Sequence, residues 1–135
     1  MIVADITEFT ISGISERGKP NQEYIAIRVN QTLNTGQYGV MLGHKPLGQT
    51  QAYPMRDNLF WFGDAILNEG DWIFLYTGPG NAFISDLPDG KKLYSTYWQK
   101  PHTVFATSET VPILFKVEAV QLGSQPQNVP HLTNA

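Results

Sequence analysis

The segment at residues 71–77 constrains the fold of this chain more than any other part. Side chains of a β-strand point alternately to opposite faces of the sheet, so this segment presents apolar residues on both faces. One face is aromatic and the other aliphatic: Trp72, Phe74 and Tyr76 against Ile73 and Leu75. A strand of this kind belongs inside a packed β-sandwich.

The rest of the chain indicates an all-β fold. Between recurrent turn residues, apolar and polar side chains alternate at period two rather than at helical spacing. We predict a β-sandwich of about eight or nine strands. The expected strands lie at residues 2–11, 24–29, 38–42, 59–62, 71–77, 93–98, 103–107 and 111–119.

Three irregular stretches are expected. The apolar residues of the first strand change parity around Glu8, which predicts a bulge or bend there. Residues 43–57 show no sustained period and contain two prolines, which predicts a long surface loop. The Leu-Pro-Asp-Gly sequence at residues 87–90 predicts a tight turn.

A chain of 135 residues fits a single domain. We place the β-sandwich domain at residues 1–122. Residues 123–135 carry no formal charge and have little to bury, so they cannot repay the entropy of ordering. We expect them to form a flexible polar tail.

Composition excludes several classes of partner. The net charge is −3 and the basic residues are scattered, which argues against nucleic acid and anionic membranes. No apolar run approaches the roughly 20 residues of a membrane helix, so we expect a soluble protein without membrane insertion. The N-terminus lacks a signal-peptide pattern, which leaves the cytoplasm as the default compartment. The chain has no cysteine, so disulfides and thiolate chemistry play no part.

Four segments together resemble the lamin-tail domain family. They read EYIAIRVN at residues 23–30, GQYGVML at 36–42, LFWF at 59–62 and LNEGDWIFLYTG at 67–78. In that family a strand containing E-[FY]-I-E-I-x-N precedes a G-W-x-L strand, an apolar strand and an L-x-x-G-x-x-[IV]-[IV] strand. Tyr38 stands where the family usually has tryptophan. The resemblance implies an immunoglobulin-like β-sandwich without catalytic activity, used as an interaction or anchoring module.

No residue pattern indicates a metal or cofactor site. His44, His102 and His131 are far apart and lack the spacing of metal ligands, so we expect no metal. Asp86 and Asp89 fit turn chemistry better than a calcium site, which takes about six to eight oxygen ligands.

Catalytic residues are not expected either. Carboxylates for glycoside hydrolysis could come from Asp57, Asp64, Glu69 and Asp71, which are close in sequence. Glu69 and Asp71 flank a glycine before a strand, where exposed acids are common. Enzyme activity would become the better hypothesis if Asp64, Glu69 and Asp71 lined one pocket.

Aromatic residues are the candidate binding site. Residues 60–62 are three consecutive aromatics, so a strand there cannot hide all of them on one face. A second aromatic cluster lies beside Lys100. The candidate binding residues are Phe60, Trp61, Phe62, Tyr97 and Trp98. Such rings mark protein or sugar contact surfaces, unless loops or another subunit cover them.

Two functions fit this sequence. The first is a non-catalytic interaction module that binds a protein partner or associates with itself through an aromatic sheet face or a strand edge. The second is a lectin-like, carbohydrate-binding sandwich in which Trp61, Tyr97 or Trp98 stacks on sugar rings. The lamin-tail resemblance favours the first function.

Overall fold

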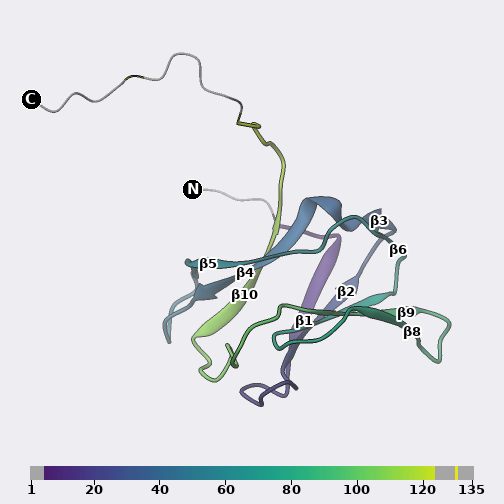
Figure 1. Cartoon of the computed structure of the whole chain (residues 1–135), viewed down its shortest axis with the longest axis horizontal. Coiled ribbons are helices and arrows are strands. Elements are labelled where there is room, and N and C mark those ends of the chain that lie inside the picture. Colours follow the sequence, from purple (N-terminus) through teal and green to yellow (C-terminus); the bar gives the residue numbers. More distant parts are fainter. Residues whose placement is uncertain (1–4, 124–129, 131–135) are drawn as a thin grey trace, which may run out of the picture.

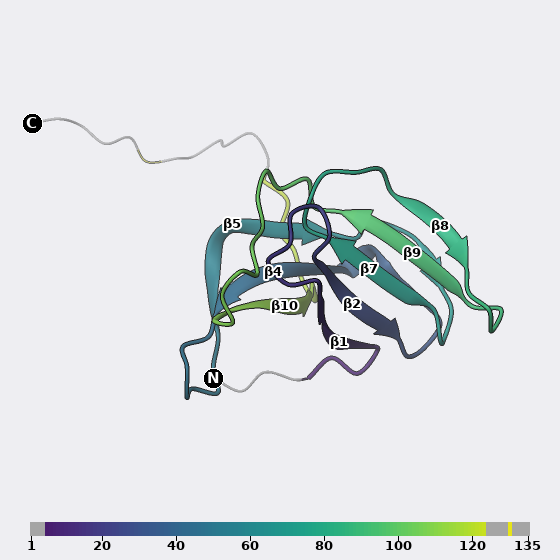
Figure 2. The same cartoon turned by 90° about the horizontal axis from the view of Figure 1, so that it is seen from below.

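The computed structural model describes residues 5–123 and 130, and these form an all-β sandwich (Figures 1 and 2). The elements of the described residues are β1 (Phe9–Ser15), β2 (Tyr24–Val29), β3 (Leu33–Asn34), the 3-10 turn η1 (Thr35–Gln37), β4 (Tyr38–His44), β5 (Tyr53–Trp61), β6 (Ile66–Leu67), β7 (Trp72–Tyr76), β8 (Phe83–Asp86), β9 (Lys92–Tyr97) and β10 (Thr110–Lys116). The described residues contain ten strands rather than eight or nine, because β3, β6 and β8 add to the predicted set and residues 103–107 form no strand.

The longer strands of the described residues form two sheets. The five-stranded sheet has the order β1-β2-β7-β9-β8, and the three-stranded sheet has the order β10-β4-β5. Neighbouring strands are antiparallel except β7 and β9, which are parallel. The predicted central strand, β7, therefore lies in the middle of the larger sheet.

The core lies between the two sheets. Ile73 and Leu75 of β7 are buried and face it, as predicted. Trp72, Phe74 and Tyr76 lie on the opposite, outer face and are only half-buried. The buried apolar residues are Phe9, Ile25, Ile27, Val29, Tyr38, Val40, Leu42, Leu67, Ile73, Leu75 and Phe105. Burying a side chain of this size stabilises the fold by about 1.5–3 kcal/mol.

A buried carboxylate joins three loops. Glu23 is 1% exposed and accepts hydrogen bonds from the backbone N–H groups of Gly18 at 2.9 Å, Val104 at 2.7 Å and Phe105 at 3.3 Å. The hydroxyl of Thr77, just after β7, donates a fourth bond at 2.7 Å. A hydrogen bond to a charged group contributes about 1.5–3 kcal/mol, so four of them offset the cost of burying the charge.

A second buried carboxylate aligns the parallel strands. Asp71 precedes β7 and is buried. Its oxygens accept hydrogen bonds from the backbone N–H of Asn68 at 2.8 Å and from that of Lys92 at 3.0 Å. Because Lys92 is the first residue of β9, this contact holds the two strands together where both begin.

The first strand differs from its prediction. It begins at Phe9, and residues 2 and 4 of the predicted strand lie outside the described residues. The predicted bend is present at Glu8, just before β1, and a bulge that was not predicted lies between Ile11 and Gly13. The extra residue, Ser12, changes the parity of the strand, so that Ile11 and Ile14 both pack against the core.

The long loop is shorter than predicted. β4 continues to His44 and β5 begins at Tyr53, so only residues 45–52 connect them. The pairing of β5 with β4 is irregular between Pro54 and Leu59, and Asp57 has a φ of 58°. This irregularity breaks the period-two pattern and hides the strand in the sequence.

The strand predicted at residues 103–107 is absent, whereas the turn predicted at residues 87–90 is present. Residues 103–107 form no strand but an irregular segment, which Glu23 holds through the hydrogen bonds above. The tight turn at 87–90 is confirmed, since the N–H of Gly90 donates to the carbonyl of Leu87 at 3.0 Å. The predicted flexible tail, residues 123–135, lies outside the described residues apart from Gly123 and Pro130.

Replacing Glu23 by glutamine tests the role of the buried carboxylate. Glu23→Gln keeps the shape but removes the charge and places an N–H₂ group against N–H donors, so we expect the free energy of unfolding to fall by about 2–4 kcal/mol. Urea denaturation followed by fluorescence measures the change. The exposed Glu69 provides the control, because Glu69→Gln should change stability by less than about 0.5 kcal/mol. Equal losses of stability in Glu23→Gln and Glu69→Gln would contradict a stabilising role of the Glu23 carboxylate.

Candidate functional site

The outer face of the three-stranded sheet is apolar. Directly paired residues of neighbouring strands point to the same side of a sheet. Val40 and Leu42 of β4 are buried and point inward, so the alternate residues of β4 and their partners point outward. These nine outward residues, which we call the apolar face, are Gly39, Met41, Gly43, Pro54, Leu59, Trp61, Val111, Ile113 and Phe115.

Two glycines of β4 let larger neighbours lie across this strand. A Cβ atom at Gly39 would be 2.5 Å from the ring of Phe115, and one at Gly43 would be 2.4 Å from the side chain of Ile113. Phe115 thus covers Gly39 and meets Trp61 edge to face, with ring centroids 5.2 Å apart. The glycines allow apolar contact to continue across all three strands.

The apolar face has no charged side chain and is partly open to solvent. Trp61 is 48% exposed and Leu59 is 45% exposed. A sheet face that meets water normally carries polar residues, whereas a contiguous apolar patch marks a contact surface. The expectation that one residue of the run 60–62 is exposed is met at Trp61.

The outer face of the five-stranded sheet carries a row of five aromatic rings. In spatial order they are Trp72, Phe74, Tyr24, Tyr76 and Tyr97. Neighbouring ring centroids lie 4.4–6.4 Å apart. All five side chains are half-buried, so each ring retains an accessible surface.

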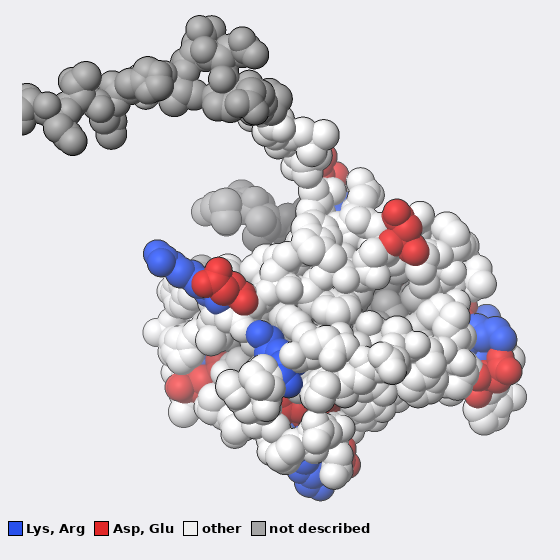
Figure 3. Space-filling view, in the orientation of Figure 1, with Lys and Arg blue, Asp and Glu red and all other residues white. Residues whose placement is uncertain are grey.

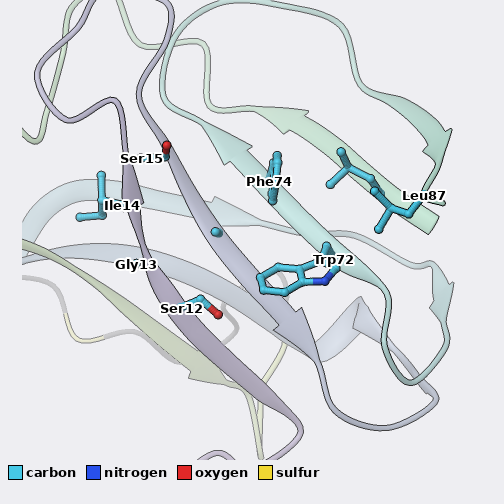
Figure 4. A pocket seen from close by; sticks show the side chains of 9 residues that line it. Ser12, Gly13, Ile14, Ser15, Trp72, Phe74 and Leu87 are labelled. Carbon is cyan, nitrogen blue, oxygen red and sulfur yellow. The ribbon is translucent and has the colours of Figure 1, made fainter. Parts of the chain in front are cut away.

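Next to this aromatic row the sheet is hollowed into a groove of about 430 Å³ (Figure 4). Trp72 and Phe74 form one wall, and residues around the β1 bulge, including Ser12, form the other. Ala26 of β2 lies between the walls, because it pairs with Gly13 on one side and with Phe74 on the other. Small residues between large ones create the hollow.

The five predicted binding residues lie in three places. Trp61 belongs to the apolar face, and Tyr97 ends the aromatic row of the other sheet. Phe60, Phe62 and Trp98 are partly buried and pack against the core. The ring centroids of Phe60 and Trp98 are 5.9 Å apart. The structure therefore does not bring the five residues together into one surface.

Sequence reasoning missed most of the apolar face. Its signal was present in β4, where Gly39 and Gly43 occupy positions that alternate with the buried Val40 and Leu42. Glycine at outward positions of a strand marks close approach by a neighbouring side chain.

The carboxylates considered for catalysis differ in burial, and Asp57 is exposed. Asp71 is buried and holds two backbone N–H groups, whereas Asp64 and Glu69 are exposed. Across residues 5–123 and 130, no three Asp, Glu, His or Cys side chains are grouped to hold a metal ion. His44 and His102 are exposed, and His131 lies outside the described residues.

A tyrosine–carboxylate contact ties β4 to the segment before β1. The buried hydroxyl of Tyr38 donates a hydrogen bond to Glu8, and the ammonium of Lys116 lies 3.9 Å from the same carboxylate. Burial and the hydrogen bond to Glu8 raise the pKa of Tyr38 to about 12. The same hydrogen bond lowers the pKa of Glu8.

The visible side of the molecule is mostly uncharged, with a few acidic and basic side chains scattered over it and along its edges (Figure 3). No helix among the described residues has the length and apolarity to cross a membrane. Comparisons of the chain with models of known families, with curated proteins and with solved structures gave no match.

The raised pKa of Tyr38 predicts a stability change at high pH. Between pH 10 and about 12 the unfolded chain loses the phenol proton while the folded chain keeps it, so the free energy of unfolding falls over this range. Tyr38→Phe should be less stable than the parent below pH 10, and the difference should shrink as pH rises toward 12. Denaturant titrations at several pH values measure this. Tyr53→Phe, at an exposed site, should keep the parent profile, and an unchanged profile in Tyr38→Phe would contradict the prediction.

Proposed function

We propose that this chain is a non-catalytic binding module that contacts a protein partner through the apolar face of its three-stranded sheet. The observation that carries the proposal is the absence of any charged side chain from nine outward positions on three adjacent strands. In a sheet face that only meets water, polar residues would occupy these positions. A partner that covers Trp61 and Leu59 would remove their apolar surface from water.

The size of the apolar face sets the expected strength of binding. With strands about 4.8 Å apart and a rise of about 3.4 Å per residue, the nine positions cover roughly 14 Å by 20 Å. This area of about 300 Å² is less than half of the roughly 800 Å² that each partner contributes to a stable complex. We therefore propose a weak, reversible contact with a dissociation constant of about 1 mM, with Trp61 as its anchor.

A second copy of the chain is the partner that we propose first. In a two-fold contact between identical surfaces, a charge near the axis approaches its own copy, and a charge elsewhere needs an opposite charge at the position that it meets. None of the nine residues of the apolar face is charged, so a contact confined to them removes no charge from water. The exposed charges of β5, Arg56 and Asp57, lie in its irregular part between Pro54 and Leu59, on the edge strand. A different protein would need only an uncharged, flat apolar surface of its own.

The assignment of the sandwich as immunoglobulin-like and lamin-tail-like belongs to the same proposal. Three of the four segments that resemble this family form β2, β4 and β7, which are inner strands of the two sheets, and the fourth, residues 59–62, includes the end of the edge strand β5. The role that the resemblance implies, an interaction or anchoring module, agrees with an apolar outer face.

Placing a charge at the centre of the contact tests the proposal. Sedimentation equilibrium of the parent chain should give a mass that rises above the monomer value of 15.1 kDa as the concentration approaches the millimolar range. Trp61→Lys should keep the monomer mass throughout, with an unchanged melting temperature because Trp61 points away from the core.

An exposed isoleucine on the other sheet provides the matched control. Ile84 of β8 is 62% exposed, and Ile84→Lys should associate as the parent does. Self-association through the apolar face would be contradicted if the parent chain stayed monomeric, or if Trp61→Lys and Ile84→Lys lost association to the same extent.

A further inference from the structure

We propose that the groove on the outer face of the five-stranded sheet binds a neutral oligosaccharide. This site is separate from the apolar face, because its walls belong to β1 and β7 of the other sheet. Its volume of about 430 Å³ falls within the roughly 300–1,000 Å³ of small-ligand sites. Three features of the groove point to this ligand: its aromatic wall, its hydroxyl groups and its lack of charged side chains.

The aromatic wall offers a flat surface for stacking. The ring of Trp72 extends from β7 over β2 toward Ser12, and Phe74 stands beside it (Figure 4). The aromatic row continues from Phe74 through the stacked ring of Tyr24, at 4.4 Å, to Tyr76. A sugar ring has one face of C–H groups that packs on such a surface, since flat rings lose their hydration at little cost. The length of the row fits several linked sugar units rather than one.

The opposite wall supplies hydrogen-bonding groups. Ser12 is the extra residue of the β1 bulge and is exposed, while Ser15 at the end of β1 is half exposed. Within the described residues neither hydroxyl forms a hydrogen bond, and both are open to a ligand that enters the groove. A serine hydroxyl both donates and accepts, as sugar hydroxyls do.

The lining contains no charged side chain, which favours a neutral ligand. Arg28, the cross-strand partner of Trp72, is exposed at the same face but outside the lining. A purely apolar ligand would pack on the other seven lining residues but would make no use of the two serine hydroxyls. A proline-rich peptide would bring acceptors but few donors, because proline has no backbone N–H. An uncharged chain of sugar rings matches both walls.

Indole N–H signals in ¹H–¹⁵N NMR spectra test the proposal, because Trp61, Trp72 and Trp98 report on different parts of the molecule. Cellohexaose, xylohexaose and maltohexaose are the probes, each titrated to millimolar concentration. We expect a saturable shift of the Trp72 signal with at least one of them, while the Trp61 signal stays in place. No saturable shift of Trp72 with any of the three would overturn the proposal. A shift of Trp72 with decaproline alone would overturn it in favour of a peptide site.

Three variants locate the binding. Ala26→Leu fills the groove from its floor with an apolar side chain and should weaken binding by roughly tenfold or more. The double variant Ser12→Ala with Ser15→Ala removes the hydroxyls at exposed positions and should weaken binding severalfold without a change in melting temperature. Trp61→Ala is the control and should bind as the parent does. Parent-like affinity in a folded Ala26→Leu variant would overturn the location, as would a loss of affinity in Trp61→Ala.

Discussion

The hydrogen bonds to the buried carboxylate of Glu23 hold together three loops of this sandwich. The chain has no cysteine, and Phe105, one of its fully buried aromatic residues, lies in an irregular segment rather than in a strand. Such a segment has no ladder of backbone hydrogen bonds to hold it. Glu23 supplies the acceptors by receiving the N–H groups of Val104 and Phe105. A residue just before β2 thereby fixes a core side chain more than 80 positions later in the sequence.

The parts of the fold that follow from local periodicity could be predicted from the sequence, and the parts that depend on distant contacts could not. β7 was predictable because Ile73 and Leu75 alternate with three aromatics. Residues 103–107 have the apolar side chains of a core strand but form none. Val104 and Phe105 reach the core because their backbone N–H groups donate to Glu23, a contact that local periodicity does not reveal. The bend at Glu8 was predictable because the apolar residues change parity between Ile6 and Phe9, whereas the bulge at Ser12 depends on the pairing of β1 with β2.

In the candidate surfaces too, local patterns could be predicted from the sequence and contacts between distant segments could not. Trp61 was predictable as an exposed ring because a strand cannot bury three consecutive aromatics on one face. Its neighbours Phe115 and Ile113 come from β10, and only the pairing of β10 with β4 brings them beside it. The groove could not be predicted at all, since it requires Ala26 between a bulge on β1 and large rings on β7. Sheet register, which single-sequence patterns do not contain, decides which side chains become neighbours.

Residues on one outer face can be substituted without altering the other face or the core. In both sheets the residues that hold the sandwich together alternate with those that face outward, so Val40 and Ile73 point inward while Met41 and Trp72 point outward. A substitution at an outward position removes little of the buried apolar area that stabilises the fold. The three tryptophans divide in this way, since Trp61 and Trp72 lie on opposite outer faces and Trp98 packs against the core. Loss of binding with retained stability is therefore the signature of either face, whereas loss of both together indicates the core.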